Sequence, residues 1–315
     1  MRIVVLESLG ISKEEINHLA EPLFKGGHEV ITYGKKDDED ALISEVSGAD
    51  VIVIANMPLS GRVILSDEKL KMISVAFTGV DHVDMASCAK KSITVCNAAG
   101  YSTSSVAELA VGLMISLLRN IVPLNDAIRH GKTRAGFSQH ELAGKTVGII
   151  GTGSIGLKVA KIVSAFGCKV IAYSRTVKRE VQNMGVTYMP LDEVLSQSDI
   201  VSIHVPLNEN TRLLLNKDKL SLMKPSSILI NAARGPIVDY SALADALKKG
   251  AISGAGLDVF ETEPPLSNHP LFSAPNVVLT PHIGFATSEA MERRAYITFD
   301  NIIKWLEGKP QNVVK

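Results

Sequence analysis

A glycine-rich turn between two regular segments constrains this chain more than any other feature of its sequence. Residues 151–156 read Gly-Thr-Gly-Ser-Ile-Gly, preceded by the β-branched run 146–150 and followed by a helical pattern at 155–166. In this setting the glycines permit a tight bend, close approach of a pyrophosphate and close helix–strand packing. The start of the helix offers free N–H groups and a positive dipole end to the phosphates. The context favours a dinucleotide site over a plain glycine turn, with these predicted contacts: Gly151, Gly153, Ser154, Ile155 and Gly156.

Apolar runs and helical patterns alternate along the whole chain, which predicts parallel sheets with helices on both faces. We expect strands at 2–6, 29–32, 51–55, 73–76 and 93–96 in a first lobe, and at 146–150, 169–173, 200–204, 227–232, 254–259 and 277–280 in a second. We expect helices at 12–24, 38–48, 103–121, 155–166, 191–197, 217–223, 240–249 and 287–308. A capping box of Ser105 with Glu108 would start the helix at 103–121, with Ser102 or Thr103 as alternative caps.

The fold class that follows is α/β, with two doubly wound parallel-sheet domains. Six strands with helical crossovers match a Rossmann cofactor domain, which we expect at residues 99–286. The first lobe lacks a covering helix after its last expected strand, so we expect the last helix of the chain, 287–308, to pack against this lobe. That arrangement gives a discontinuous, flavodoxin-like substrate domain made of residues 1–98 plus 287–315.

The second strand of the expected cofactor domain ends without an acidic residue. It is followed by Ser174, Arg175 and Thr176, and Ser174 lies 18 residues after Gly156 (174 − 156). NAD sites usually carry an acid here for the ribose 2′-hydroxyl, whereas an arginine accommodates the 2′-phosphate of NADP. The sequence therefore favours NADP(H) as the cofactor, with NAD(H) as the alternative.

Polar side chains also follow three later strands of the same domain, and they are Arg234, Asp258 with Glu263, and His282. Ligands of open α/β sheets bind outside the carboxyl ends of the strands, so we expect these side chains to share one site. A histidine titrates near neutral pH, a nearby carboxylate favours its protonated form, and an arginine grips a substrate carboxylate. Each residue alone more often has a structural role, but together they predict a reductase of 2-oxo acids.

Motifs along nearly the whole chain resemble those of the D-isomer-specific 2-hydroxyacid dehydrogenase family. Besides the glycine turn, the matching segments are 77–81, 106–108, 204–207, 231–235, 256–264 and 280–284. The resemblance implies that Arg234 binds the substrate carboxylate and carbonyl, and that His282 is the acid–base group, paired with Glu263. It also implies a cleft between the two lobes and a homodimer formed around residues 103–145.

The same resemblance implies further binding residues. The substrate side would include Asn56, Tyr101 and the backbone N–H groups of Thr78, Gly79 and Val80. Asp258 would contact the nicotinamide side. The other cofactor contacts would be Val106, Val205, Pro206, Ala232, Ala233, His282 and Gly284. No metal site is predicted.

The segment 100–103 looks like that of glycerate dehydrogenases and hydroxypyruvate reductases, and the segment 174–176 looks like that of glyoxylate and hydroxypyruvate reductases. The segment 53–58 lacks the arginine that phosphoglycerate dehydrogenases often carry there, which disfavours a phosphorylated substrate. Our leading hypothesis is NADPH-linked reduction of glyoxylate or hydroxypyruvate. The alternatives are an NAD-linked D-lactate or D-3-phosphoglycerate-type dehydrogenase and, from another class, a non-enzymatic dinucleotide-sensing protein resembling corepressors.

Composition limits the partners and the location of the protein. Lys plus Arg and Asp plus Glu both number 33, so the neutral chain offers no basic footprint for nucleic acid and no signal for an anionic membrane. Its cysteines, Cys88, Cys96 and Cys168, match no disulfide or zinc spacing, which predicts free thiols in a reducing compartment. We expect a cytoplasmic enzyme whose partner is a small acid.

Overall fold

The computed structural model describes residues 1–314, and their contacts divide the chain into two compact units. Unit 1 comprises Met1–Ser102 together with the segment from Ala286 onward, and unit 2 is Thr103–Phe285. The sequence placed the corresponding boundaries at 98/99 and 286/287. The last helix, α12 (Ser288–Leu306), packs against elements of unit 1.

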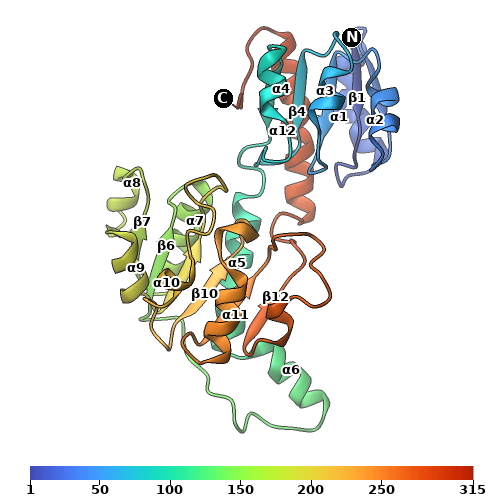
Figure 1. The fold of residues 1–315 in the computed structure, drawn as a ribbon. Coiled ribbons are helices and arrows are strands. Elements are labelled where there is room, and N and C mark those ends of the chain that lie inside the picture. Colours follow the sequence, from blue (N-terminus) through green and yellow to red (C-terminus); the bar gives the residue numbers. More distant parts are fainter. Residues whose placement is uncertain (315) are drawn as a thin grey trace. The chain divides into compact units, whose positions relative to one another are not determined.

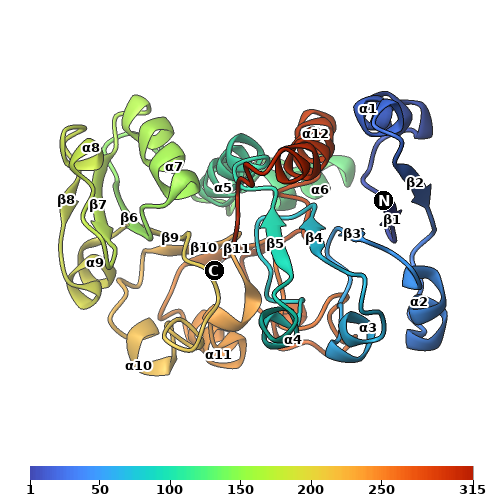
Figure 2. The same cartoon turned by 90° about the horizontal axis from the view of Figure 1, so that it is seen from above.

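Unit 1 is built on a five-stranded parallel sheet in the order β2-β1-β3-β4-β5, which is the flavodoxin-like order. Its strands are β1 (Arg2–Val5), β2 (Glu29–Thr32), β3 (Val51–Ile54), β4 (Met72–Val75) and β5 (Thr94–Asn97). Figure 2 shows α1 (Lys13–Lys25) and α12 on one face of this sheet, and α2 (Glu39–Val46), α3 (Gly61–Leu65) and α4 (Met85–Lys90) on the other.

Local sequence explains how the covering helices of unit 1 start and which face they bury. Ser12 and Glu15 form a reciprocal capping box at the start of α1, in which each side chain accepts a hydrogen bond from the other's backbone N–H. Ile16, Ala20 and Leu23 then recur at helical spacing and are buried against the sheet and α12.

Unit 2 is built on a seven-stranded parallel sheet in the order β12-β11-β10-β9-β6-β7-β8. Its strands are β6 (Thr146–Ile150), β7 (Lys169–Tyr173), β8 (Thr187–Tyr188), β9 (Ile200–Ile203), β10 (Ile228–Asn231), β11 (Gly254–Leu257) and β12 (Val277–Leu279). The chain enters at β6, runs outward to β8, and then crosses to β9 on the other side. This reversal is the topological switch point at which Rossmann folds bind their ligands.

Helices cover both faces of the second sheet (Figures 1 and 2). α5 (Thr103–Leu118) and α7 (Ser154–Ala165) share one buried cluster with the sheet, whereas α9 (Leu191–Gln197), α10 (Lys217–Leu220) and α11 (Tyr240–Lys248) share another. Alternate residues of a central strand enter opposite clusters: Ile149 lies in the first and Ile150 in the second. Both faces of a central strand are therefore buried, which agrees with the continuous apolar runs in the sequence.

Five short elements of the two units were not predicted from the sequence. α3, α4, α6 (Ile121–Arg129), α8 (Arg179–Gln182) and β8 were not predicted, so the second sheet has seven strands rather than six. These elements are four to nine residues long, and β8 has two, which is too short for a hydrophobic period to be read. The predicted helix 103–121 ends at Leu118, because Asn120 adopts a left-handed conformation with φ of 52°. Ser105 lies inside the first turn of α5, so it is not the cap.

No single helix within residues 1–314 is long and apolar enough to cross a membrane. α5 and α6 meet those criteria only when taken together, and they are bent by 56° relative to each other.

Candidate active site

The glycine turn at 151–156 has three glycines with three different surroundings. Gly151 has φ of 95°, and a Cβ on it would lie 2.6 Å from the His204 carbonyl oxygen. A Cβ on Gly156 would lie 2.0 Å from the Gly151 carbonyl oxygen, whereas a Cβ on Gly153 would have no atom within 4 Å. The protein's own packing therefore requires the first and third glycines, and the second leaves an open space.

The start of α7 fits a phosphate at that open space. The helix begins at Ser154, and the capping residue Gly153 has no side chain to accept from the first N–H groups. Those N–H groups and the helix dipole are suited to an anion, and an exposed glycine lets that anion approach the backbone. Val205 lies against the same turn, because its Cγ1 would be 2.7 Å from a Cβ on Gly151. The residues present thus fit the pyrophosphate of a dinucleotide.

The segment after β7 presents hydroxyl and cationic groups. Ser174 is partly buried, while Arg175 and Thr176 are exposed. Arg175 forms no ion pair with any residue in the described part of the chain. Lys178 and Arg179 add two more cations before the first carboxylate, Glu180, so this loop is suited to an additional phosphate.

His282 and Glu263 form a close pair at the carboxyl edge of the second sheet. His282 Nδ1 lies 2.7 Å from Glu263 Oε2, and both side chains are partly exposed. The second carboxylate oxygen of Glu263 accepts a hydrogen bond from the Phe260 N–H at 3.1 Å. The His282 ring also contacts Phe285 edge-on, with centroids 5.1 Å apart. The imidazole is therefore held on two sides and oriented by a carboxylate.

The loop that carries His282 is organised by the buried carboxylate of Asp258. Its Oδ1 accepts hydrogen bonds from the Thr280 hydroxyl at 2.6 Å and the Ile283 N–H at 2.8 Å, and its Oδ2 accepts from the Gly284 N–H at 2.8 Å. The His282 N–H donates to the Asp258 carbonyl oxygen at 2.7 Å. These bonds hold His282 at a φ of 53°, a conformation that few non-glycine residues adopt.

Arg234 reaches the same region through the turn after β10. The Asn231 side chain donates to the Arg234 carbonyl oxygen and accepts from the Ala233 N–H, both at 3.0 Å. The turn packs tightly on the next strand end, because a Cβ on Gly235 would lie 2.1 Å from the Phe260 carbonyl carbon. Phe260 in turn binds Glu263, so the turns after β10, β11 and β12 are locked together.

Charges and burial in this region shift three pKa values. Burial acts to raise the pKa of Glu263, but the hydrogen bond and charge of His282, the Phe260 N–H and the Arg234 charge lower it more, so it lies below its ordinary value. Burial raises the pKa of Asp258, partly offset by its hydrogen bonds from Thr280, Ile283 and Gly284. Burial lowers the pKa of His204 to about 4, so this histidine is neutral at physiological pH.

The remaining residues expected at the cofactor lie in unit 2 around the same strand ends. Val106, on α5, is nearly buried beside Gly284, with its Cγ2 3.5 Å from the position of a Cβ there. Ala232 and Ala233 are partly buried in the turn before Arg234, and Pro206 is exposed after Val205.

The residues expected on the substrate side belong to unit 1. Asn56 and Thr78 are exposed, and Gly79 and Val80 are partly so, in the turns that follow β3 and β4. The Glu7 carboxylate accepts hydrogen bonds from the Ala55 and Met57 N–H groups at 2.9 and 3.0 Å, which fixes the turn that carries Asn56. Tyr101 is only 1% exposed and packs against Phe77, so it lies in the core of the unit rather than on its surface.

Sequence reasoning gave no role to Glu7, Asn231 or Tyr240, which support the candidate residues. Tyr240 accepts from the Asn231 side chain at 3.0 Å and donates to the Val259 carbonyl oxygen at 2.8 Å, joining α11 to two strand ends. For Glu7 and Asn231 a signal was present, because each lies at or just beyond the end of a buried strand.

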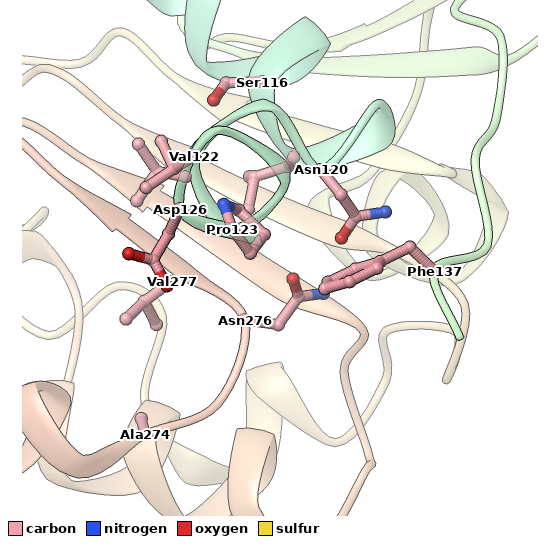
Figure 3. Close-up of a pocket in the computed structure, with 11 residues that line it drawn as sticks. Ser116, Asn120, Val122, Pro123, Asp126, Phe137, Ala274, Asn276 and Val277 are labelled. Atoms are coloured by element: carbon pink, nitrogen blue, oxygen red, sulfur yellow. The ribbon is translucent and has the colours of Figure 1, made fainter. Parts of the chain in front are cut away.

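A cavity of about 380 Å³ lies elsewhere in unit 2 (Figure 3). Figure 3 shows Val122, Pro123 and Asp126 of α6 at this cavity with Asn276 and Val277. These last two residues stand at the amino end of β12, whereas His282 follows its carboxyl end. The cavity is therefore not the candidate active site.

Comparison with known proteins fits this geometry. Residues 111–284 match the model of the D-isomer specific 2-hydroxyacid dehydrogenase, NAD binding domain. The chain belongs to the D-isomer specific 2-hydroxyacid dehydrogenase family. The match covers the glycine turn, Arg234, Glu263 and His282, so this D-2-hydroxyacid dehydrogenase is built to hold a nicotinamide dinucleotide.

Relatives of this D-2-hydroxyacid dehydrogenase carry several names. It is 37% identical to a glycerate dehydrogenase of Methylorubrum extorquens, over 93% of this chain and 94% of the other. It is 40% identical to a glyoxylate reductase of Thermococcus litoralis, over 89% and 88%. A solved structure of an acyclic imino acid reductase with NADPH and D-Arg has a TM-score of 0.90, with 31% identity over the whole of both chains. Other matches are named D-3-phosphoglycerate dehydrogenase and D-lactate dehydrogenase, and one similar structure holds NAD.

Proposed function

We propose that this enzyme reduces glyoxylate or hydroxypyruvate to the corresponding 2-hydroxy acid and prefers NADPH to NADH. The observation that carries the proposal is the His282–Glu263 pair, held at 2.7 Å and locked to the turn that bears Arg234. This set supplies a proton and a carboxylate grip, which reduction of a 2-oxo acid needs. A protein that only senses a dinucleotide has no use for it.

The residues divide the chemistry between them. When bound, the nicotinamide ring would donate or accept a hydride at the 2-carbon of the acid. His282 would give a proton to the carbonyl oxygen, and it would do so at Nε2, because Glu263 engages Nδ1. Glu263 stabilises the imidazolium that precedes this transfer, and its lowered pKa keeps it ionised at neutral pH.

Arg234 would bind the substrate carboxylate with its guanidinium and polarise the adjacent carbonyl. Asn56 and the backbone N–H groups of Thr78, Gly79 and Val80 stay proposed substrate contacts, on the resemblance to the family. The buried Tyr101 would act by holding these turns in place. On the cofactor side, Asp258 fixes the His282 loop, and Val106, Val205, Ala232 and Ala233 offer an apolar lining to the nicotinamide.

The preference for NADPH is supported by the loop after β7. Ser174, Arg175 and Thr176 occupy the place at which an acid would bind the ribose diol of NADH, and an acid would repel a 2′-phosphate. Arg175 is exposed and forms no ion pair within residues 1–314, so its charge is available to that phosphate.

The choice of substrate is supported by the names of similar proteins and by the lack of a cationic side chain in the turn after β3. The similar proteins include a glycerate dehydrogenase and glyoxylate reductases. The turn after β3 reads Ala-Asn-Met-Pro at 55–58 and contains no cation that could bind a phosphorylated substrate. A D-3-phosphoglycerate dehydrogenase activity is therefore disfavoured, and D-lactate dehydrogenase remains the alternative that the test must separate.

The proposal is tested by steady-state oxidation of NADPH and NADH with a panel of 2-oxo acids. The panel is glyoxylate, hydroxypyruvate, pyruvate and phosphohydroxypyruvate. We expect the highest kcat/KM with NADPH and one of the first two. A higher kcat/KM with NADH refutes the cofactor preference, and a preference for pyruvate or phosphohydroxypyruvate refutes the substrate assignment.

We also propose that the enzyme is a homodimer formed through the region 103–145. α6 exposes Ile121, Val122 and Ile128 at 50%, 53% and 67%, and such apolar exposure is characteristic of an interface. Val122 also lines the cavity of Figure 3. Light scattering should give twice the 33.8 kDa mass of the chain. Ile128→Glu should shift the mass toward that of the monomer. A wild-type mass equal to that of one chain would refute the proposal.

A reducing compartment such as the cytoplasm is supported by the thiols. Cys88, Cys96 and Cys168 are all free, and Cys88 and Cys96 are buried. Burial raises the pKa of both buried thiols to about 11, so they are inert rather than catalytic.

A further inference from the structure

The loop 174–178 is attached to the glycine turn at both of its ends. At its start, the Gly151 N–H donates to the Tyr173 carbonyl oxygen at 2.8 Å. At its end, the Lys178 N–H donates to the phenol oxygen of Tyr188 at 3.3 Å, and that phenol donates to the Thr152 hydroxyl at 2.9 Å. Tyr188 therefore bridges the loop and the turn through one oxygen atom.

The position of Tyr188 makes this bridge short and rigid. It is the last residue of β8 at the edge of the sheet, paired with Ala172 of β7 (Figure 2). Its ring packs against the buried cluster under α7, and Thr152 is only 1% exposed. A side chain anchored by its ring and bonded at its oxygen can position both segments.

We propose that Tyr188 is a positioning residue that sets the discrimination between a 2′-phosphate and a 2′-hydroxyl on the cofactor. This inference rests on the proposed function, in which the glycine turn binds the pyrophosphate and Arg175 binds the 2′-phosphate. The pyrophosphate is common to both cofactors, whereas the 2′-phosphate is not. The loop's register against the turn thus decides whether Arg175 reaches the phosphate while the pyrophosphate is bound.

The test variant is Tyr188→Phe, which removes one oxygen atom and keeps the ring. Its control is Tyr33→Phe in unit 1, which likewise removes one phenol oxygen and keeps the ring. The Tyr33 hydroxyl accepts a hydrogen bond from the Arg2 guanidinium at 3.1 Å. The net worth of one hydrogen bond corresponds to roughly a 2- to 12-fold change in an equilibrium constant.

The first measurement is amide hydrogen exchange of the cofactor-free protein. The Lys178 amide should exchange about fivefold faster or more in Tyr188→Phe, and the control should leave it unchanged. An unchanged exchange rate at Lys178 would mean that the phenol does not hold the loop, and it overturns the inference.

The second measurement is calorimetric binding of NADPH and NADH to the wild type, Tyr188→Phe, Tyr33→Phe and Arg175→Ala. Tyr188→Phe should raise the Kd for NADPH about fivefold and the Kd for NADH less than about twofold. Equal increases for both cofactors, together with a lowered melting temperature, would show a merely structural role and would overturn the inference.

The two proposals fail in distinguishable ways. If the wild type binds NADH more tightly and Arg175→Ala leaves the Kd for NADPH unchanged, the proposed cofactor preference is wrong. The role of Tyr188 is then still tested by the ratio of the Kd for NADPH to the Kd for NADH, because the loop that it holds would border the ribose of either cofactor. A ratio within about twofold of the wild type in Tyr188→Phe overturns the inference whichever cofactor the enzyme prefers.

Discussion

His282 Nδ1 lies 2.7 Å from Glu263 Oε2, although the two residues come from different turns and are 19 positions apart. The pair leaves Nε2 of the imidazole as the atom for proton transfer. Burial acts to raise the pKa of Glu263, but the hydrogen bond and charge of His282 help to lower it below its ordinary value. Two loops thus form one acid–base unit.

Replacing His282 by alanine should remove the proton donor without disturbing the cofactor site. We expect kcat for reduction of the oxo acid to fall by ~10²–10⁴. The Kd of NADPH, measured by calorimetry, should stay within about twofold, and His18→Ala on the exposed face of α1 serves as the control. An active His282→Ala enzyme would contradict the assignment.

Replacing Asp258 by asparagine should loosen the loop that carries His282. The amide group cannot accept both the Ile283 and Gly284 N–H bonds that the carboxylate oxygens accept at 2.8 Å. Because His282 has φ of 53°, it depends on these anchors. We expect kcat to fall by roughly 10- to 100-fold while the KM for the oxo acid changes less. Crystallography should show a displaced 280–284 loop, and an unmoved loop would count against this role.

Replacing Arg234 by alanine should weaken the grip on the substrate. A charge-assisted bidentate bond is lost, so the KM for the oxo acid should rise by about 100-fold. Arg234→Lys should recover only part of it, because an ammonium cannot form the planar fork. Kinetics of both variants check this, and a KM for the alanine variant close to that of the wild type would exclude Arg234 as the carboxylate ligand.

The glycines of the turn should respond in opposite ways to alanine. At Gly156 the new methyl would lie 2.0 Å from the Gly151 carbonyl oxygen, so we expect a loss of about 3 kcal/mol or more in unfolding free energy. At Gly153 nothing lies within 4 Å, so stability should change by less than about 1 kcal/mol while the Kd of the dinucleotide rises at least tenfold. Urea unfolding and calorimetry measure the two effects. Unaltered dinucleotide binding in Gly153→Ala would argue against a pyrophosphate at this turn.

Stability should depend on pH through His204. Its pKa is lowered to about 4 by burial, from an ordinary value of 6.5, so the unfolded chain binds the proton more readily. Stability is therefore complete above pH 6.5 and declines as the pH falls toward 4, by on the order of 2 kcal/mol for this partly buried ring. His204→Gln lacks this titration, so the difference in unfolding free energy between the wild type and the variant should shrink over that window. A constant difference would contradict the burial of a neutral ring.

Much of the fold could be predicted because the long helices show a clear helical period and the buried strands are continuous apolar runs. Apart from β8, the strands of both sheets lie within a few residues of their predicted ranges, and so do α1, α5, α7 and α12. Several short elements could not be predicted, namely α3, α4, α6, α8 and β8. β8 has only two residues, yet it places Tyr188 at the edge of the sheet, and it is a strand because Thr187 and Tyr188 pair with Ile171 and Ala172 of β7.

The sequence by itself determined the chemistry of the candidate site: a glycine turn, an arginine, a carboxylate and a histidine after successive strands, with no acid after β7. Tertiary structure decided how these groups are held. Asp258 was expected to contact the nicotinamide, which stays a prediction. Its carboxylate accepts hydrogen bonds from the turn after β12, which depends on the chain folding back over the 26 residues between Asp258 and Gly284. Likewise Tyr188 meets Thr152 across 36 residues. Residue types and strand ends are local properties, whereas hydrogen bonds between turns exist only once the parallel strands have brought those turns together.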